Sequence, residues 1–203
     1  MILMYHKVDV VAPTIWWVSR DVFNRQMAAI SHRSVVRLSD YSPEDPDQCV
    51  ITFDDAYENV YRHAFPILRE HGYPFEIFVN GDLIGRWNAF DPSEPKTRFC
   101  GMEGLMEMVA AGGRIQWHTA SHRDLTGLPL VDAASEIRVS DDLRHRFEPP
   151  HLSWFAYPYG IHTPEIVQLV RDRFEGAVSV SDGSDDDRFR LNRIVATEQT
   201  VLA

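Results

Sequence analysis

The hydrophobic residues of this chain follow two spacings that alternate along the sequence. Short apolar runs predict buried strands at residues 2–5, 35–38, 49–53, 75–79, 114–117, 153–156, 177–180 and 189–194. Between them, apolar residues recur every three or four positions and predict helices near residues 19–30, 57–71, 103–111, 131–147 and 163–174. Ser19 is expected to cap the first helix and Gly72 to end the second. Strands that alternate with helices are typical of a parallel sheet, either open or closed into a barrel.

The composition indicates one globular unit and excludes several classes of protein. The chain has 203 residues, 44% of them hydrophobic, and we expect a single domain over residues 1–203. Acidic residues outnumber basic ones by 30 to 20, and the net charge of -10 argues against nucleic acid as a partner. Two cysteines are too few for a disulfide framework or a cysteine-rich metal site. Because no apolar run reaches the length of a membrane span and the first residues do not form a signal peptide, we expect a cytoplasmic protein.

Polar residues with catalytic chemistry directly follow four of the predicted strands. In chain order, they are His6, Asp54, Asp55, His118, His122 and the turn at residues 157–160. Parallel α/β folds build their active sites at the carboxyl ends of the strands. We therefore expect these residues to converge.

Asp54 and Asp55 are adjacent carboxylates, which repel each other unless a cation neutralises one of them. The other carboxylate is then free to act as a base. His118 and His122, four residues apart at the matching edge, can supply the further ligands that a metal ion needs. Histidines with this spacing are also common on a surface helix or in a core, but the paired aspartates favour a metal site.

Three motifs occur in a recognisable order and spacing. They are Thr52-Phe53-Asp54-Asp55, His118-x-x-Ser121-His122 and Phe155-Ala156-Tyr157-Pro158-Tyr159-Gly160. The set resembles the first three motifs of the polysaccharide deacetylase family, the nodulation-protein-B homology group related to carbohydrate esterase family 4. The likeness extends over nearly the whole chain. It implies a single-domain α/β protein with a deformed, incomplete (β/α) barrel.

The resemblance also implies a metal-dependent N-deacetylase that acts on an acetylated amino sugar or glycan. Carried over position by position, Asp55, His118 and His122 become ligands of one divalent metal ion, zinc or alternatively cobalt or nickel. Asp54 becomes the catalytic base, and the backbone N–H of Tyr159 becomes an oxyanion donor. Such a ligand set leaves a position for water, whose pKa the metal ion lowers while it polarises the amide carbonyl.

Cleavage of an amide also requires an acid that protonates the leaving amine. In the family's common arrangement this acid is a histidine on the final strand, but here no histidine follows His162. The first and last strands of a barrel are neighbours, so a circular permutation would put His6 in the same place, and we predict that His6 is the acid. This arrangement resembles the poly-N-acetylglucosamine deacetylase branch. The alternative is a strand histidine bonded to the backbone.

Two positions depart from the family pattern. Many members have an arginine that orients the catalytic aspartate where this chain has Ala156, and we expect Arg193 to take its place beside Asp54. Ala56 replaces the glycine that usually follows the two aspartates, a mild change if the backbone there is helical.

Three further residues are candidates for contact with the substrate. Trp17, which follows Trp16 in the connection after the first strand, can stack on a sugar ring or pack at the start of the next helix. Tyr157 and His162 belong to the third motif or follow it. Two rival functions stay open: a sugar-binding protein of the same fold that has lost turnover, and an enzyme of the same mechanism that acts on a non-sugar amide.

Overall fold

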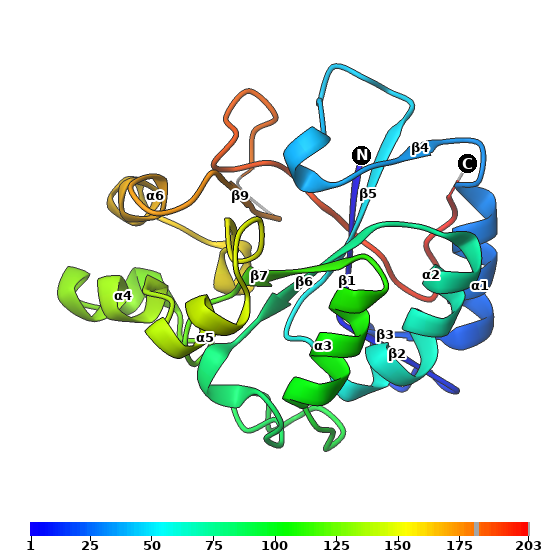
Figure 1. The fold of residues 1–203 in the computed structure, drawn as a ribbon, viewed down its shortest axis with the longest axis horizontal. Helices are drawn as coiled ribbons and strands as arrows, with labels where there is room; N and C mark the ends of the chain where they lie inside the picture. The colour runs from blue at the N-terminus through cyan, green and yellow to red at the C-terminus, as the bar shows by residue number, and fades with distance from the viewer. Residues whose placement is uncertain (181–182, 203) are drawn as a thin grey trace.

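A curled parallel sheet of eight strands forms the centre of the molecule (Figure 1). The computed structural model describes residues 1–180 and 183–202. The strands of this sheet are β1 (Ile2–Tyr5), β4 (Ser34–Val35), β5 (Gln48–Phe53), β6 (Phe75–Val79), β7 (Gly113–Trp117), β8 (Trp154–Ala156), β9 (Gly176–Val178) and β10 (Ile194–Val195). Their order is β10-β1-β5-β6-β7-β8-β9, with β4 paired to the start of β5, and all these pairs are parallel. The predicted α/β class and incomplete barrel are confirmed.

The segment between the two edge strands differs from the prediction of one strand at residues 189–194. Only Ile194–Val195 forms β10, which pairs with β1. Leu191 instead bridges to Val178 of β9, at the opposite edge of the sheet. The segment therefore crosses from one edge to the other, and Arg193 lies in the crossing.

Helices lie around the sheet; in the view of Figure 1, α1 and α2 are at the right, α3 is below the centre, and α4, α5 and α6 are at the left. They are α1 (Arg20–Ala29), α2 (Phe65–His71), α3 (Met102–Ala110), α4 (Leu130–Ile137), α5 (Asp141–Arg146) and α6 (Pro164–Arg171). A π-helical turn at Val60–Ala64 precedes α2, and 3-10 turns occur at Leu38–Asp40, Gly81–Leu83, Leu125–Gly127 and Pro158–Gly160. As predicted, the Ser19 hydroxyl caps α1, and Gly72 ends α2 with a left-handed φ of 68°.

Two predicted elements are divided in the structure. The expected helix at 131–147 is two helices, because Arg138 has an extended ψ of 123° and the Ser140 hydroxyl caps a new helix, α5. The expected strand at 35–38 is the short β4 followed by a 3-10 turn. The sequence analysis also missed β2 (Lys7–Asp9) and β3 (Trp17–Ser19), which pair in a separate small parallel sheet.

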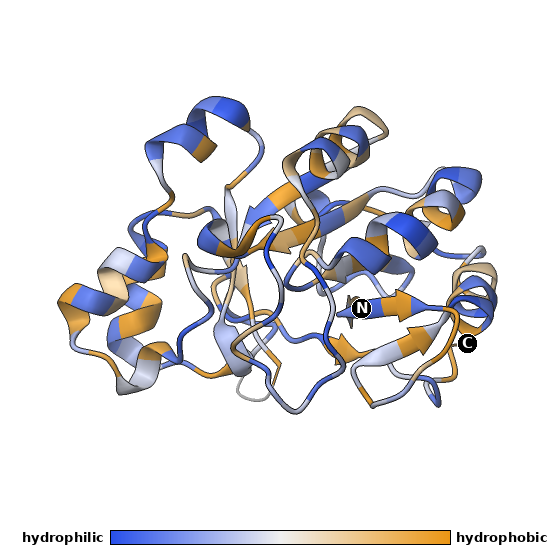
Figure 2. Cartoon of the chain, turned by 90° about the horizontal axis from the view of Figure 1, so that it is seen from below, coloured by the Kyte–Doolittle hydropathy of each residue, from blue (hydrophilic) through white to orange (hydrophobic). Residues whose placement is uncertain are grey.

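Five strands, β1, β5, β6, β8 and β9, contribute alternate residues to two apolar clusters. The smaller cluster lies on the concave face of the sheet and includes Ile2, Val50, Phe78, Trp154 and Val178. Their direct neighbours in the chain belong to the larger cluster, which packs the sheet against the helices: Leu3, Ile51, Ile77, Phe155 and Ala177. In Figure 2 the strands are accordingly mostly orange, whereas the helices carry blue residues on their outer faces. The same alternation continues beyond the strand ends, so residues such as Asp54 and Asn80 lie on the concave side of the sheet, where the candidate site is.

Candidate active site

Three side chains with metal-binding atoms meet in one cavity at the carboxyl ends of the strands. The Nε2 atoms of His118 and His122 lie 3.8 Å and 3.6 Å from Oδ1 of Asp55. One ligand atom from each residue lies within 4.8 Å of the others, and all three side chains are buried. The structure thus brings together the three residues that the sequence predicted as metal ligands.

The spacing of these atoms fits a divalent metal ion. Zinc bonds of about 2.1 Å at tetrahedral angles put neighbouring ligand atoms about 3.4 Å apart. Nδ1 of His118 lies 2.7 Å from the carbonyl oxygen of Ala156. A carbonyl only accepts, so Nδ1 carries the hydrogen and Nε2 presents its lone pair to the cavity. Burial lowers the pKa of His118 and of His122 to about 4, so both are neutral, as metal ligands must be.

Asp54 and Asp55 both reach the cavity because the backbone turns directly after β5, which ends at Phe53. Adjacent strand residues point to opposite faces, but Asp55 has a φ of 66° and Ala56 a φ of 55°. This left-handed turn lets Asp55 face the same cavity as Asp54. The helical backbone that would have made Ala56 a mild replacement for glycine is therefore not present, and a left-handed alanine costs about 1 kcal/mol.

Asn80 holds Asp55 in position from the end of the neighbouring strand β6. Its Nδ2 donates to Oδ1 of Asp55 at 2.8 Å, and the asparagine is buried. The sequence analysis missed Asn80, although it stands directly after a predicted strand, in the same kind of position as His6, Asp54 and His118.

Glu136 on α4 fixes the turn that carries the two histidines. Its Oε2 accepts the N–H of Ser121 at 2.9 Å, and its Oε1 accepts the Ser121 hydroxyl at 2.7 Å. Within the turn, Thr119 and His122 have left-handed φ values of 73° and 62°. The two imidazole centroids are consequently 4.8 Å apart. A turn rather than a helix therefore sets the geometry of this pair.

Arg193 binds the carboxylate of Asp54 with two parallel hydrogen bonds. Nη1 donates to Oδ1 at 2.6 Å, and Nη2 donates to Oδ2 at 2.7 Å. Burial by itself raises the pKa of Asp54, but Arg193 and His118 outweigh it and hold this pKa well below its usual range. Oδ2 of Asp54 lies 4.0 Å from Nε2 of His118. An ionised, oriented carboxylate thus stands beside the three candidate ligands.

His6 lines the same cavity from the end of β1. This strand lies between β5 and β10, so the first and last strands are neighbours, as predicted. Burial lowers the pKa of His6, although Asp54 and Asp55 act in the opposite direction. Its imidazole is therefore neutral near pH 7, and its ring meets that of Trp16 edge-on, with 4.9 Å between centroids.

Tryptophan and tyrosine candidates are divided between the cavity and the protein interior. Tyr159 lines the cavity with a left-handed φ of 59°, and its ring meets that of His122 edge-on at 4.8 Å between centroids. Trp16, not the predicted Trp17, lines the cavity as well. Trp17 is buried, and its indole N–H donates to Glu94 at 2.8 Å, because adjacent residues of an extended segment point in opposite directions.

Tyr157 and His162 lie outside the set of residues that line the cavity. The Tyr157 hydroxyl donates to the carbonyl of Phe189 at 2.9 Å. The His162 ring packs against that of Tyr157, with 4.9 Å between centroids. The Tyr157 contact joins the third motif to the segment before β10, and His162 packs on Tyr157 just after the motif.

The fold and this cavity together define a class of protein: a parallel α/β half-barrel with a candidate metal centre at the carboxyl ends of its strands. Comparison with family models is consistent with that class. The model of the polysaccharide deacetylase family matches residues 42–173, more than half of the chain. The chain therefore belongs to the polysaccharide deacetylase family.

Two curated relatives are similar over most of this chain. YxkH of Bacillus subtilis, which is named after the same family, is 27% identical over 166 residues that cover 79% of this chain and 55% of the relative. The poly-β-1,6-N-acetyl-D-glucosamine N-deacetylase of Staphylococcus epidermidis is 25% identical over 163 residues, 72% of this chain and 54% of the relative. The chain thus spans about half the length of these relatives.

Solved structures of deacetylases share the fold. The Streptococcus pyogenes deacetylase PplD superposes with a TM-score of 0.80 and 22% identity, and the match covers 98% of this chain and 92% of PplD. IcaB from Ammonifex degensii has a TM-score of 0.76 and 23% identity, with 97% and 91% covered. Within residues 1–180 and 183–202, none of the helices has both the length and the apolar character that a bilayer span requires.

Proposed function

We propose that this chain is a metal-dependent hydrolase that removes the N-acetyl group of an acetylated amino sugar within a glycan. The observation that carries the proposal is the position of the Asp54–Arg193 pair beside Asp55, His118 and His122. A carboxylate that stays ionised next to a metal centre can take a proton from water. A protein that only binds sugar has no use for such a base.

The residues of the site divide the work of amide hydrolysis. Asp55, His118 and His122 would hold a divalent ion, zinc or alternatively cobalt or nickel, which lowers the pKa of water and polarises the amide carbonyl when bound. Asp54 accepts the proton of the attacking water. Arg193 keeps the Asp54 carboxylate ionised and in one plane, so that the proton is accepted at a defined position.

Two further groups act on the charges that develop during the reaction. The backbone N–H of Tyr159 donates to the oxyanion formed from the acetyl carbonyl. His6 gives a proton to the departing sugar nitrogen, because an amide anion is a poor leaving group. Since His6 is neutral at rest, it first receives the proton that Asp54 took from water. Its lowered pKa makes the protonated imidazole a ready donor.

The substrate class that we propose is a polymer of N-acetylglucosamine. The relative from Staphylococcus epidermidis carries the name of a deacetylase of poly-β-1,6-N-acetyl-D-glucosamine. At the cavity of the present chain, Trp16 and Tyr159 are 38% and 55% exposed. Their rings offer apolar faces of the kind that pack against sugar rings.

The test is acetate release from N-acetylglucosamine and from its β-1,6-linked and β-1,4-linked oligomers. Protein treated with a chelator should be inactive, and zinc, cobalt or nickel should restore activity. Asp54→Asn should retain zinc but lose turnover by about a hundredfold to ten-thousandfold. Asp47→Asn, an exposed residue before the start of β5, is the matched control and should behave like the wild type. Full activity of Asp54→Asn or of the chelator-treated protein would refute the mechanism, and oligomers that bind without acetate release would indicate a sugar-binding protein.

A further inference from the structure

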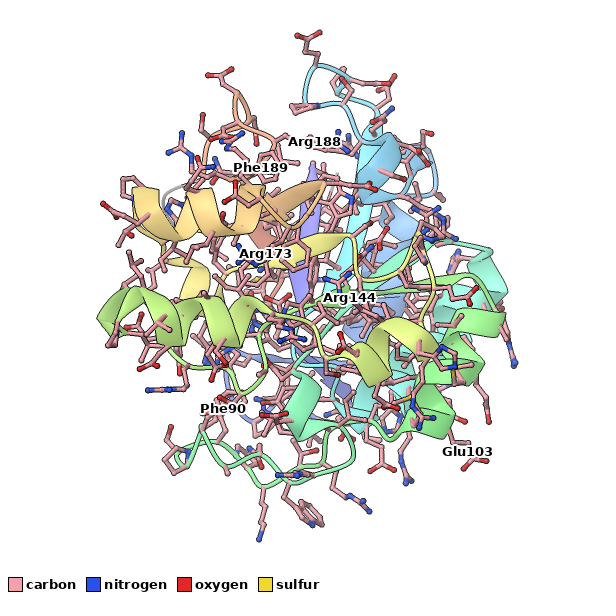
Figure 3. The ribbon with its side chains drawn as sticks, turned by 60° about the vertical axis from the view of Figure 1, so that its left-hand side comes forward. Phe90, Glu103, Arg144, Arg173, Arg188 and Phe189 are labelled. Carbon is pink, nitrogen blue, oxygen red and sulfur yellow. The ribbon has the colours of Figure 1, made fainter. Side chains whose placement is uncertain are left out.

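The loop of residues 86–98 forms one wall of the cavity and packs directly on the candidate metal site. Its two limbs are paired, with an antiparallel bridge between Trp87 and Arg98. Phe90, near its tip, stacks on the ring of His122 with 4.1 Å between centroids. Figure 3 shows Phe90 on this loop, beside the ends of the central strands. The contacts that fix this loop in place therefore also determine the shape of the cavity in which a substrate would bind.

Glu94 anchors the loop to the small sheet that follows His6. Its Oε2 accepts hydrogen bonds from Nζ of Lys7 at 3.2 Å, the Thr14 hydroxyl at 3.0 Å and the Trp17 indole at 2.8 Å. Burial alone would raise the pKa of Glu94, but these donors outweigh it and lower the pKa. The side chain is 8% exposed, so Glu94 is an ionised internal anchor rather than a group that faces a ligand.

Lys7 connects this anchor to a second carboxylate of the loop, that of Asp91. Its Nζ lies 3.4 Å from Oδ2 of Asp91 and 4.4 Å from the ring centroid of Tyr57. The Lys7 side chain is only 1% exposed. A buried ammonium requires nearby negative charge, and the two loop carboxylates supply it. The attraction fixes Asp91 as well as Glu94.

Asp91 differs from Glu94 because its carboxylate faces the cavity. It is one of the lining residues, and its side chain is 24% exposed. Lys7 contacts Oδ2, and in the described part of the chain no side chain or backbone donor contacts Oδ1. Three aromatic residues, Phe90, Trp16 and Tyr159, line the same cavity. Asp91 is thus a charged acceptor in a cavity with aromatic lining residues, and none of the proposed chemical steps uses it.

We propose that Asp91 is a specificity-determining residue, whose carboxylate accepts hydrogen bonds from hydroxyl groups of the substrate sugar. Sugar hydroxyls donate well to a carboxylate, and bonds to a charged acceptor are stronger than neutral ones. The inference rests on the proposed function and adds how the site recognises its substrate. Lys7 and Glu94 act as positioning residues, since they hold the loop so that Asp91 faces the cavity.

The test measures binding apart from turnover. A pentamer of β-1,6-linked N-acetylglucosamine is titrated into zinc-loaded Asp54→Asn protein and followed by NMR chemical shifts. Adding Asp91→Asn, which keeps the side-chain size and removes the charge, should weaken binding about tenfold. Adding Asp47→Asn instead removes an equal charge from an exposed position at the other end of β5, and should leave the affinity unchanged.

In the otherwise wild-type protein, Asp91→Asn should raise the KM for acetate release from the pentamer about tenfold and change kcat by less than about threefold. Equal pentamer affinity with and without Asp91→Asn would overturn the inference. The absence of any pentamer binding would also overturn it. A loss of zinc affinity in Asp91→Asn that parallels the loss of pentamer affinity would do the same, because the substitution would then act by displacing the loop and not by removing a sugar contact. Failure of the proposed function looks different: the pentamer binds in a manner that depends on Asp91, yet the wild type releases no acetate.

Discussion

Two adjacent aspartates have different chemistry here because their partners differ. Asp55 faces two neutral imidazoles and accepts one bond from Asn80. Asp54 accepts two bonds from a guanidinium group. Both carboxylates are buried. The partners of Asp54 would not suit a metal ligand, and the partners of Asp55 would not suit a base. The partners, rather than the aspartates themselves, separate a candidate ligand from a candidate base.

Arg193→Lys tests this separation. The substitution keeps the positive charge but removes the pair of parallel bonds, so the Asp54 carboxylate loses its fixed plane and part of its stabilisation as an anion. We expect kcat to fall about tenfold to a hundredfold. Because Arg193 lowers the pKa of Asp54, its weakening raises that pKa, and the acidic limb of the kcat/KM profile should move to higher pH.

A matched control is Arg138→Lys, which alters an exposed arginine paired with Asp141. It should leave the pH profile in place. An unchanged acidic limb in Arg193→Lys, measured on the same oligomer, would show that the Asp54–Arg193 pair does not govern the base.

At the scale of elements, strand ends and turns deliver the site residues. Alternation along β1, β5 and β7 points His6, Asp54 and His118 to the concave side. Asp55 and His122 depend instead on left-handed turns just beyond the strands. The turn that carries His122 is held from α4 by Glu136, a contact that joins a helix on the outside of the sheet to the candidate metal centre.

Glu136→Ala should weaken zinc binding without touching a ligand. Loss of both bonds to Ser121 frees the histidine turn, and we expect the zinc affinity to fall about tenfold to a hundredfold, as measured by competition with a chromophoric chelator. Glu136→Gln can accept the Ser121 N–H and donate to its hydroxyl, so it should restore most of the affinity. Equal zinc affinity in the alanine variant and the wild type would contradict a positioning role.

At the scale of the whole molecule, residues from both ends of the chain complete the cavity. His6 follows the first strand, Arg193 precedes the last, and β1 and β10 are paired. Both residues lie outside the segment 42–173 that matches the family model. The proposed acid, His6, and the residue that orients the proposed base, Arg193, therefore come from the two ends of the chain, which the family model does not match.

The concave face also buries a carboxyl group that makes the stability of the whole fold depend on pH. Glu76 is completely buried, and burial raises its pKa to about 7 despite bonds from Gln116 and the Leu38 N–H. The folded state thus holds a proton that the unfolded state has lost between about pH 4.5 and 7. The contribution of Glu76 to the free energy of unfolding should therefore decrease as pH rises through this window, by at most about 1.4 kcal/mol per pH unit.

Urea denaturation between pH 4.5 and 8 measures this effect. Glu76→Gln should lose this contribution, so its free energy of unfolding should rise more steeply, or fall less, with pH than that of the wild type, whatever its absolute stability. Exposed Glu44→Gln should keep the wild-type slope. The histidines with pKa values of about 4 act in the opposite direction, but they are present in every variant, so the difference between variants isolates Glu76. Identical pH slopes in the wild type and Glu76→Gln would show that this carboxyl does not titrate as expected.

Sequence reasoning succeeded where the deciding interaction is local. Ser19 and Gly72 act within one turn of a helix, and period-two alternation fixes which strand residues share a face. It failed where a neighbour distant in the chain decides. Trp17 rather than Trp16 turns inward to Glu94, 77 residues away, and the expected strand at 189–194 is divided between two edges of the sheet.

By itself the sequence determined the α/β order, the strand ends that carry Asp54, His118 and His6, and the family resemblance, because periodicity and motif spacing are properties of neighbouring residues. Only the tertiary structure decided that Asn80, Glu136 and the 86–98 loop support or border the site. The sequence suggested Arg193 as the partner of Asp54, but the structure decided that two parallel hydrogen bonds join these residues, which are 139 positions apart. Curling of the sheet brings these groups within bonding distance, and a linear pattern does not encode that distance.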